Sequence, residues 1–167
     1  ARDVTESAGV RAASLVQSVG TGTTLLTGLV DVNTATGVQI TTNNISVGGG
    51  ITTAAGSNGI VTLTNIGTLT VGGSIDSDGD VTVNGIGTTL LNADIVTSTD
   101  IVQFQQPVLI SGNRLIDTTT APTLGSGGAI QFLNTVNGGG NSLTLAAPSG
   151  SGDILFNGAV SNLTGLS

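Results

Sequence analysis

The amino-acid sequence predicts an all-β protein, and within that class a right-handed parallel β-helix (β-solenoid), in which short coils of backbone stack along an axis. Three observations support this prediction. Apolar and polar residues alternate through short segments, 27 glycines in 167 residues interrupt these segments, and one motif recurs along the chain. An antiparallel β-sandwich is the alternative, but hairpins do not predict a register of equivalent positions.

The recurring motif consists of two apolar residues separated by one residue, which is polar in most copies. Successive copies are 23, 20, 21, 28 and 24 residues apart. Alternation of this kind is typical of a half-buried strand, so each copy predicts one strand in each coil. The six copies are Val38-Gln39-Ile40, Val61-Thr62-Leu63, Val81-Thr82-Val83, Val102-Gln103-Phe104, Ile130-Gln131-Phe132 and Ile154-Leu155-Phe156.

All three phenylalanines of the chain occupy the last position of this motif, and a valine follows each of them four residues later. Stacked coils lie about 4.8 Å apart, so equivalent side chains fall directly above one another. The sequence therefore predicts a ladder inside the solenoid. Its members are Phe104, Phe132, Phe156, Val108, Val136 and Val160.

A longer period is superimposed on the short one. The segment 22–26 returns as 87–91, with the sequence Gly-Thr-Thr-Leu-Leu in both places. We therefore predict two tandem repeats of about three coils each, residues 22–86 and 87–167. Residues 1–21 would be the end of a preceding repeat or a cap. Six coils would make a rod of roughly 30 Å.

Only one segment, Ser7 to Val19, has apolar spacing compatible with a helix, although Gly9 and the β-branched valines disfavour it. Elsewhere the chain alternates as strands do, for instance from Ile60 to Thr64. Glycine clusters and the Asn84-Gly85 pair predict corners that need a positive φ angle.

The composition excludes several classes of function. The chain has no Lys, His, Cys, Met, Trp or Tyr, and three arginines against ten acids give a formal net charge of −7. Catalytic sites that use His or Cys and soft-ligand zinc sites cannot form. The negative charge disfavours nucleic-acid binding, and no apolar run approaches the ~20 residues of a membrane span, so we expect no membrane insertion.

Calcium is the one cofactor that the sequence suggests. Asp76, Asp78 and Asp80 alternate in a glycine-containing turn, where their oxygens could converge on Ca²⁺. A calcium loop of the EF-hand type would need Glu at the position of Gly87, however, and the second repeat keeps only the last acid, as Asp153. The alternative is a solvated turn.

The same acids raise the question of catalysis. Asp80 and Asp153 occupy equivalent positions before a strand, with Asp100 in another coil, and paired carboxylates can act as general acid and base. A carbohydrate-active enzyme on this scaffold would need basic neighbours, but Arg114 is the only arginine in the repeat region. No Trp or Tyr is present to stack on a sugar. We therefore expect turn residues and no enzyme.

Threonine pairs recur through the chain and suggest a further alternative, a module that binds ice or another ordered surface. A lattice of outward hydroxyl and methyl groups could order water, but the pairs do not occupy one position in every coil. Threonine is also a common residue of exposed strands. The pairs and the one triplet are Thr23-Thr24, Thr41-Thr42, Thr52-Thr53, Thr88-Thr89 and Thr118-Thr119-Thr120.

The motif Gly-Asp-[Val/Ile]-x-[Val/Phe]-Asn-Gly at 79–85 and 152–158 resembles the β-strand repeats of large bacterial secreted proteins related to filamentous haemagglutinins and autotransporter passengers. The resemblance implies a secreted or cell-surface protein with adhesive or scaffolding work, and it carries over no catalytic residue. We expect self-association into a filament or array, a surface or glycan ligand, and a structural or assembly function in a cell-surface fibre, matrix or adhesin.

Overall fold

The computed structural model describes residues 2–120, 128–147 and 152–167. In these residues every regular element is a β-strand, every strand pair is parallel, and the strands form a solenoid of about 7 turns. The predicted all-β solenoid is confirmed, and the sandwich alternative is wrong because its antiparallel pairs do not occur among the described strands.

Each turn presents one strand to each of three faces. Face A consists of β1 (Val4–Glu6), β4 (Thr23–Leu26), β7 (Asn44–Val47), β10 (Thr68–Val71), β13 (Thr88–Leu91) and β16 (Val108–Ile110). Face B consists of β2 (Val10–Ala12), β5 (Val30–Val32), β8 (Ile51–Thr53), β11 (Ile75–Ser77), β14 (Ile95–Thr97) and β17 (Arg114–Asp117). Near the C-terminal end β19 (Val136–Ala146) joins these two faces, and β21 (Val160–Leu166) pairs with it.

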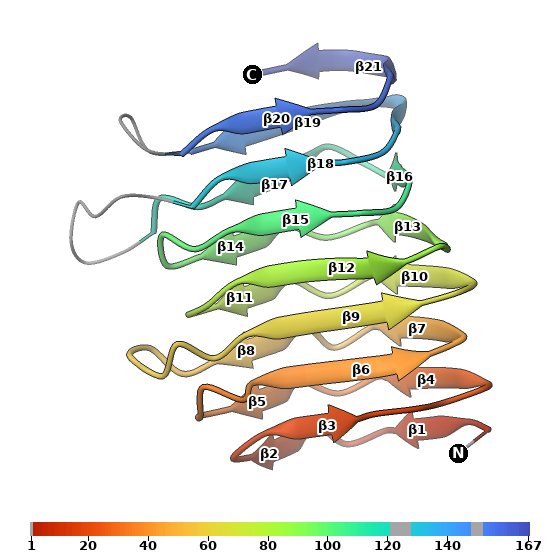
Figure 1. Cartoon of the computed structure of the whole chain (residues 1–167), viewed down its shortest axis with the longest axis vertical. Helices are drawn as coiled ribbons and strands as arrows, with labels where there is room; N and C mark the ends of the chain where they lie inside the picture. Colours follow the sequence, from red (N-terminus) through yellow and green to blue (C-terminus); the bar gives the residue numbers. More distant parts are fainter. Residues whose placement is uncertain (1, 121–127, 148–151) are drawn as a thin grey trace.

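Face C is a separate seven-stranded sheet. Its strands run to the right at the front of Figure 1, while those of faces A and B run to the left behind them as the chain climbs, so the solenoid is right-handed. The strands of face C are β3 (Leu15–Gln17), β6 (Val38–Thr42), β9 (Val61–Asn65), β12 (Val81–Gly85), β15 (Val102–Phe104), β18 (Ile130–Phe132) and β20 (Ile154–Phe156).

The register of face C follows the sequence motif. Every copy of the motif lies directly above the previous copy, although the chain between them varies in length. The first motif residues pair as Val38 with Val61, Val61 with Val81, Val81 with Val102, Val102 with Ile130 and Ile130 with Ile154. The register is therefore kept whatever the spacing of the copies, because a shift of one residue would turn the apolar side chains outward.

The core is a continuous column of aliphatic and phenyl side chains along the axis. Alternate residues of each interior strand point inward and are almost completely buried, as in β9, where Val61 and Leu63 have no exposed surface. One coil cannot enclose its own apolar side, so burial comes from the coils above and below it.

Glycine is required at one tight corner after face C. Gly85 has φ +105°, and a Cβ atom there would lie 2.0 Å from the carbonyl oxygen of Asn65 in the coil below. Both the backbone conformation and the lack of space exclude a larger residue. Close stacking of the corners thus explains this position of the Asn-Gly pair.

The helix considered for Ser7 to Val19 is not formed. The segment contains β2 and β3, which pair with β5 and β6, and Gly9 makes the corner before them with φ +97°. Pairing with the next coil overrides the weak helical spacing.

Residues 4–17, for which the sequence allowed a cap or the end of an earlier repeat, form β1 to β3 of the first turn. The strand ladders continue across residues 86 and 87 without interruption. The division into units 22–86 and 87–167 stays a prediction about the sequence repeat.

Candidate functional site

The three phenyl rings form a parallel stack inside face C. The ring centroids of Phe104 and Phe132 are 5.2 Å apart with an interplanar angle of 5°, and those of Phe132 and Phe156 are 5.0 Å apart at 3°. The first two rings are fully buried and Phe156 is half-buried. On face A, register pairs link the valines that follow these rings: Val108 with Val136, and Val136 with Val160.

The aspartates considered for calcium point to different partners. A carboxylate oxygen of Asp78 accepts the Asn58 N–H at 2.7 Å, and one of Asp80 accepts the Ile101 N–H at 2.9 Å, so each ties its coil to a neighbouring coil. Asp76 points outward from β11. Within the described part of the chain no three acidic side chains form a group that could hold a metal ion. The structure does not bring these three together as a calcium site.

Asp100 lies near the same corner, and its pKa is raised above the ordinary value of 3.8. Burial is the main cause, and the negative charges of Asp80 and Asp78 add to it. Asp153 is remote from this group, since β20 lies three strands from β12 on face C. The separation of about 14 Å exceeds the ~5–9.5 Å between the carboxyl groups of glycosidases. Asp80 and Asp153 are thus not arranged as such a pair.

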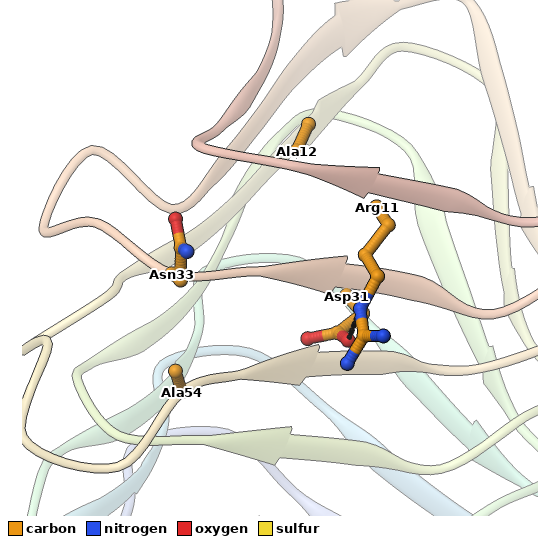
Figure 2. A pocket seen from close by; sticks show the side chains of 5 residues that line it. All are labelled: Arg11, Ala12, Asp31, Asn33 and Ala54. Atoms are coloured by element: carbon orange, nitrogen blue, oxygen red, sulfur yellow. Dashed lines mark hydrogen bonds and ion pairs between the residues drawn. The ribbon is translucent and has the colours of Figure 1, made fainter.

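Two of the three arginines neighbour aspartates on face B. Figure 2 shows Arg11 and Asp31, whose Nε and Oδ2 atoms are 2.9 Å apart at an open pocket of about 450 Å³ that Ala12, Asn33 and Ala54 also line. The Arg11 side chain is 89% exposed, and exposed ion pairs of this kind contribute little to stability. The pocket is therefore a shallow surface feature.

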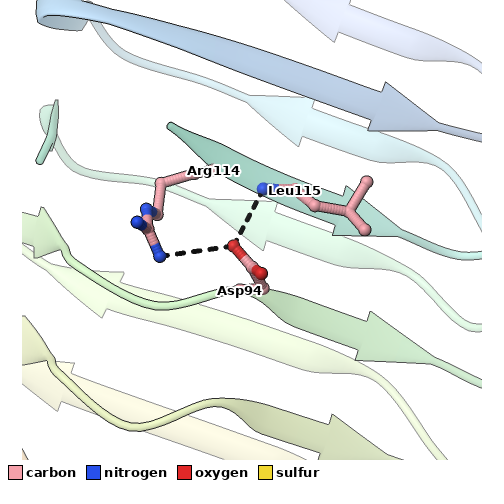
Figure 3. Close-up of polar contacts among 3 residues, drawn as sticks. All are labelled: Asp94, Arg114 and Leu115. Carbon is pink, nitrogen blue, oxygen red and sulfur yellow. Dashed lines mark hydrogen bonds and ion pairs between the residues drawn. The ribbon is translucent and has the colours of Figure 1, made fainter. Parts of the chain in front are cut away.

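Arg114 is also committed to a local contact. Its Nη1 atom lies 3.5 Å from an Asp94 carboxylate oxygen, which accepts the Leu115 N–H at 3.0 Å (Figure 3). Arg114 begins β17 on face B, whereas Asp80 precedes β12 on face C. The arginine considered for a catalytic site thus belongs to a different face of the solenoid.

The threonine segments divide their hydroxyl groups between the interior and the surface. In each segment one threonine is buried and at least one is not; for example, Thr41 is exposed whereas Thr42 is 2% exposed and donates to the Gly22 carbonyl oxygen at 3.0 Å. The threonine pairs therefore do not form a double outward row of the kind considered for ice binding. The buried members are Thr24, Thr42, Thr53, Thr89 and Thr118.

Sequence reasoning missed a buried polar contact at the corner between faces C and A. Gln106 is 1% exposed, and its Nε2 atom donates to Asn65 Oδ1 at 2.9 Å and to Thr89 Oγ1 at 2.8 Å. Asn65 in turn donates to the Gly67 carbonyl oxygen at 2.8 Å. The bond to Thr89 joins neighbouring coils, whereas the bond to Asn65 spans two coils, because Asn65 is paired with Gly85 of the intervening coil. Gln106 lies outside the repeated motif, so no local pattern marks it.

Over its five inner strands, the outer surface of face C is an uncharged ladder of amide and hydroxyl side chains, whereas the end strands β3 and β20 expose Val16 and Leu155. The middle residues of the motif supply its main row, and Gln103 Nε2 donates to Gln131 Oε1 in the next coil at 2.7 Å. The outward residues of β6, β9, β12, β15 and β18 are Gln39, Thr41, Thr62, Thr64, Thr82, Asn84, Gln103 and Gln131. Face B differs, because Asp31, Asp76 and Asp117 point outward from its strands.

Both ends of the described rod expose residues whose equivalents are buried in the interior. At the N-terminal end Val4, Val10 and Leu15 line an apolar hollow of about 330 Å³, together with residues of the second coil. At the C-terminal end Ile154 is 45% exposed and Val160 38% exposed. These side chains belong to the first and last described coils, each of which has a neighbouring coil on one side only.

Comparison with known proteins gives no assignment: no protein-family model matches the chain, and no curated protein and no solved structure matches it significantly. Among the residues that the structure describes, no helix is long and apolar enough to cross a membrane.

Proposed function

We propose that this chain is a structural segment that forms or extends a fibre, matrix or adhesin at the cell surface, and that it does so by stacking of solenoid coils between copies. The observation that carries the proposal is the uninterrupted parallel ladder, in which every interior coil pairs with the coils on either side of it and is buried by them. A coil of a second copy could pair with an end coil in the same way.

The C-terminal end illustrates what a further coil would supply. Inside the rod, the Ile130 N–H donates to the Asp153 carbonyl oxygen of the next coil at 2.9 Å. The equivalent N–H of Ile154 has no coil above it among the described residues, and its side chain is 45% exposed where that of Ile130 is buried. An unpaired strand edge of this kind is a template for another strand.

Apolar contact would provide most of the driving force. Each aliphatic side chain that goes from exposed to buried contributes roughly 1.5–3 kcal/mol, reduced here because the end residues are already part-buried. Several such residues lie at each end, as Val4, Val10 and Leu15 do at the first coil. The loss of rigid-body freedom on association opposes this gain, so we expect assembly that depends on protein concentration.

The location is the second part of the proposal. Its support is the resemblance of the Gly-Asp-x-x-x-Asn-Gly motif to repeats of bacterial secreted proteins. A rod with a regular outer surface suits scaffolding and the presentation of an adhesive surface to a partner or glycan.

Assembly can be tested by sedimentation velocity and electron microscopy over a range of protein concentrations. We expect fibres or end-joined rods from the native chain. Leu15→Asp should abolish them, because it places a charge in the apolar hollow at the first coil. Thr5→Asp is the matched control, because Thr5 points outward from β1 in the same coil and the substitution adds the same charge outside the core. Particles that stay single at every concentration, or equal effects of the two variants, would refute stacking.

A further inference from the structure

We propose that face C is a lateral contact surface through which two copies of this solenoid pair side by side. The inference goes beyond end-to-end stacking, because it concerns the long side of the rod. Side-by-side pairing does not require that the rods first stack end to end. The partner is a second copy of this chain, with face C against face C.

The side chains of face C are chemically complementary to themselves. Hydroxyl and carboxamide groups such as those of Thr62, Thr82 and Gln103 each carry both hydrogen-bond donors and acceptors. Two identical surfaces of this kind can therefore satisfy each other. A twofold axis between the rods would make the contact self-complementary and closed, as in most homodimers.

Exposed isoleucines at the edges of face C add an apolar contribution. Ile66 and Ile86 follow β9 and β12 at the same corner of successive coils, and they are 64% and 84% exposed. Ile101, which precedes β15 at the opposite edge, is 38% exposed. Large apolar side chains gathered along one face are typical of protein contact surfaces.

The distribution of charge separates face C from face B. The outward ladder of face C contains no charged side chain from Gln39 to Gln131, whereas Asp31, Asp76 and Asp117 point outward from face B. Face B also carries Arg11 and Arg114 beside aspartates, and burying these charged groups in a contact would cost desolvation energy. The acids nearest to the strands of face C, Asp80 and Asp100, lie at the edge where β12 and β15 begin, so two copies can meet over the uncharged strands with these carboxylates at the rim of the contact.

The period of the ladder favours a second copy over other partners. The outward side chains repeat with every strand, about every 4.8 Å along the axis. Another copy has the same period by construction, so a contact made at one coil recurs at each of the others. A partner with a different spacing would match at only a few positions.

The area available sets the expected strength. Seven strands span about 30 Å, and their mean length of about four residues spans about 13 Å, so each face covers about 400 Å². Pairing would bury about 800 Å² in total, less than the ~1,000 Å² of a specific, stable interface. We therefore expect a weak dimer, seen only at high protein concentration. Rods lengthened by stacking would pair more firmly.

The test uses the Leu15→Asp variant as a background, so that end stacking does not obscure side-by-side pairing. Small-angle X-ray scattering at rising protein concentration should show the cross-sectional radius of gyration increase while the rod length stays constant. Sedimentation equilibrium on the same samples gives the dissociation constant.

Three single substitutions to glutamate locate the contact, because each replaces an outward threonine on a different face. Thr62→Glu on face C should weaken pairing by about tenfold or more, since like charges would meet across the interface. Thr52→Glu on face B and Thr70→Glu on face A are the matched controls and should leave the dissociation constant nearly unchanged. Far-UV circular dichroism verifies that each variant remains folded.

Several outcomes would overturn the inference without touching end stacking. These are single rods at the highest concentration reached, a greater effect of Thr70→Glu than of Thr62→Glu, or pairing that lengthens the rod without thickening it. Thermal hysteresis from single rods, lost in Thr62→Glu, would assign the face to ice instead of a second copy. If the native chain forms no fibres while the Leu15→Asp variant still pairs side by side, end stacking is refuted and lateral pairing stands.

Discussion

Truncating the central ring of the phenyl stack gives the most direct test of the core. Phe132 is fully buried and lies between two parallel rings at 5.2 and 5.0 Å. Phe132→Ala removes about 2–3 kcal/mol of apolar burial. The loss of two ring contacts adds about 1 kcal/mol each. We expect a loss of roughly 4–5 kcal/mol in unfolding free energy, at the upper end of the range for Phe→Ala substitutions.

The end of the same stack provides the control. Phe156 is half-buried and touches one ring, so Phe156→Ala should cost about 2 kcal/mol. The chain contains no Trp or Tyr, so urea unfolding should be followed by far-UV circular dichroism. Equal m-values among the variants are needed for the comparison, because long repeat arrays can lose cooperativity. The reasoning fails if the end ring costs as much as the central one.

Two further substitutions test a corner and a charge. Gly85→Ala should cost about 2–4 kcal/mol in urea unfolding, because it combines a positive φ with a clash against the Asn65 carbonyl oxygen. Gly56→Ala, with φ +77° and open space around the site, should cost only about 1 kcal/mol, and similar values for both would contradict the packing argument. The raised pKa of Asp100 means that the folded state binds the proton of this carboxyl group more tightly than the unfolded state does. The stabilisation that comes from this proton is present below the unfolded pKa of 3.8 and is lost as pH rises through the folded pKa. Asp100→Asn should therefore raise the melting temperature near neutral pH and reduce the rise in melting temperature on acidification. If the variant and the native chain show the same dependence of melting temperature on pH, Asp100 does not have this effect on stability.

The strands of face C were predictable because stacking converts a sequence repeat into a spatial register. Inward side chains such as Val61 and Val81 must lie over one another if each coil is to be buried, so the motif alone fixes the pairing. The register also holds at Ile130, which pairs with Val102 although 28 residues separate the two along the chain. An apolar repeat of this kind therefore predicts the strands and their stacking more firmly than it predicts the backbone conformation of the corners.

The first coil was less predictable because its strands are short and one inward position is polar. In β3 the motif position that other coils fill with Ile, Leu, Val or Phe is Gln17, whose Oε1 accepts the Thr24 hydroxyl at 2.7 Å. Three residues cannot display much alternation, so the segment could also be interpreted as a helix. Only the pairing with β6 decides between the two.

The aspartates illustrate a second limit. The sequence shows that Asp78 and Asp80 are close along the chain, but it does not show which backbone N–H lies in the coil beside each one. Their carboxylates accept N–H groups of Asn58 and Ile101, which are 20 and 21 residues away. These bonds explain the acids at this corner without a metal, and they depend on corner geometry that the repeat does not specify.

The uninterrupted strand ladder also affects how such a molecule can change in length. A duplicated turn, for example residues 44–65, would present the same inward pattern to the coils above and below it, so it could be inserted without redesigning either neighbour. A partial duplication would instead leave one face a strand short. Evolution and engineering can thus lengthen this molecule in steps of one whole turn, each of which adds about 4.8 Å along the axis.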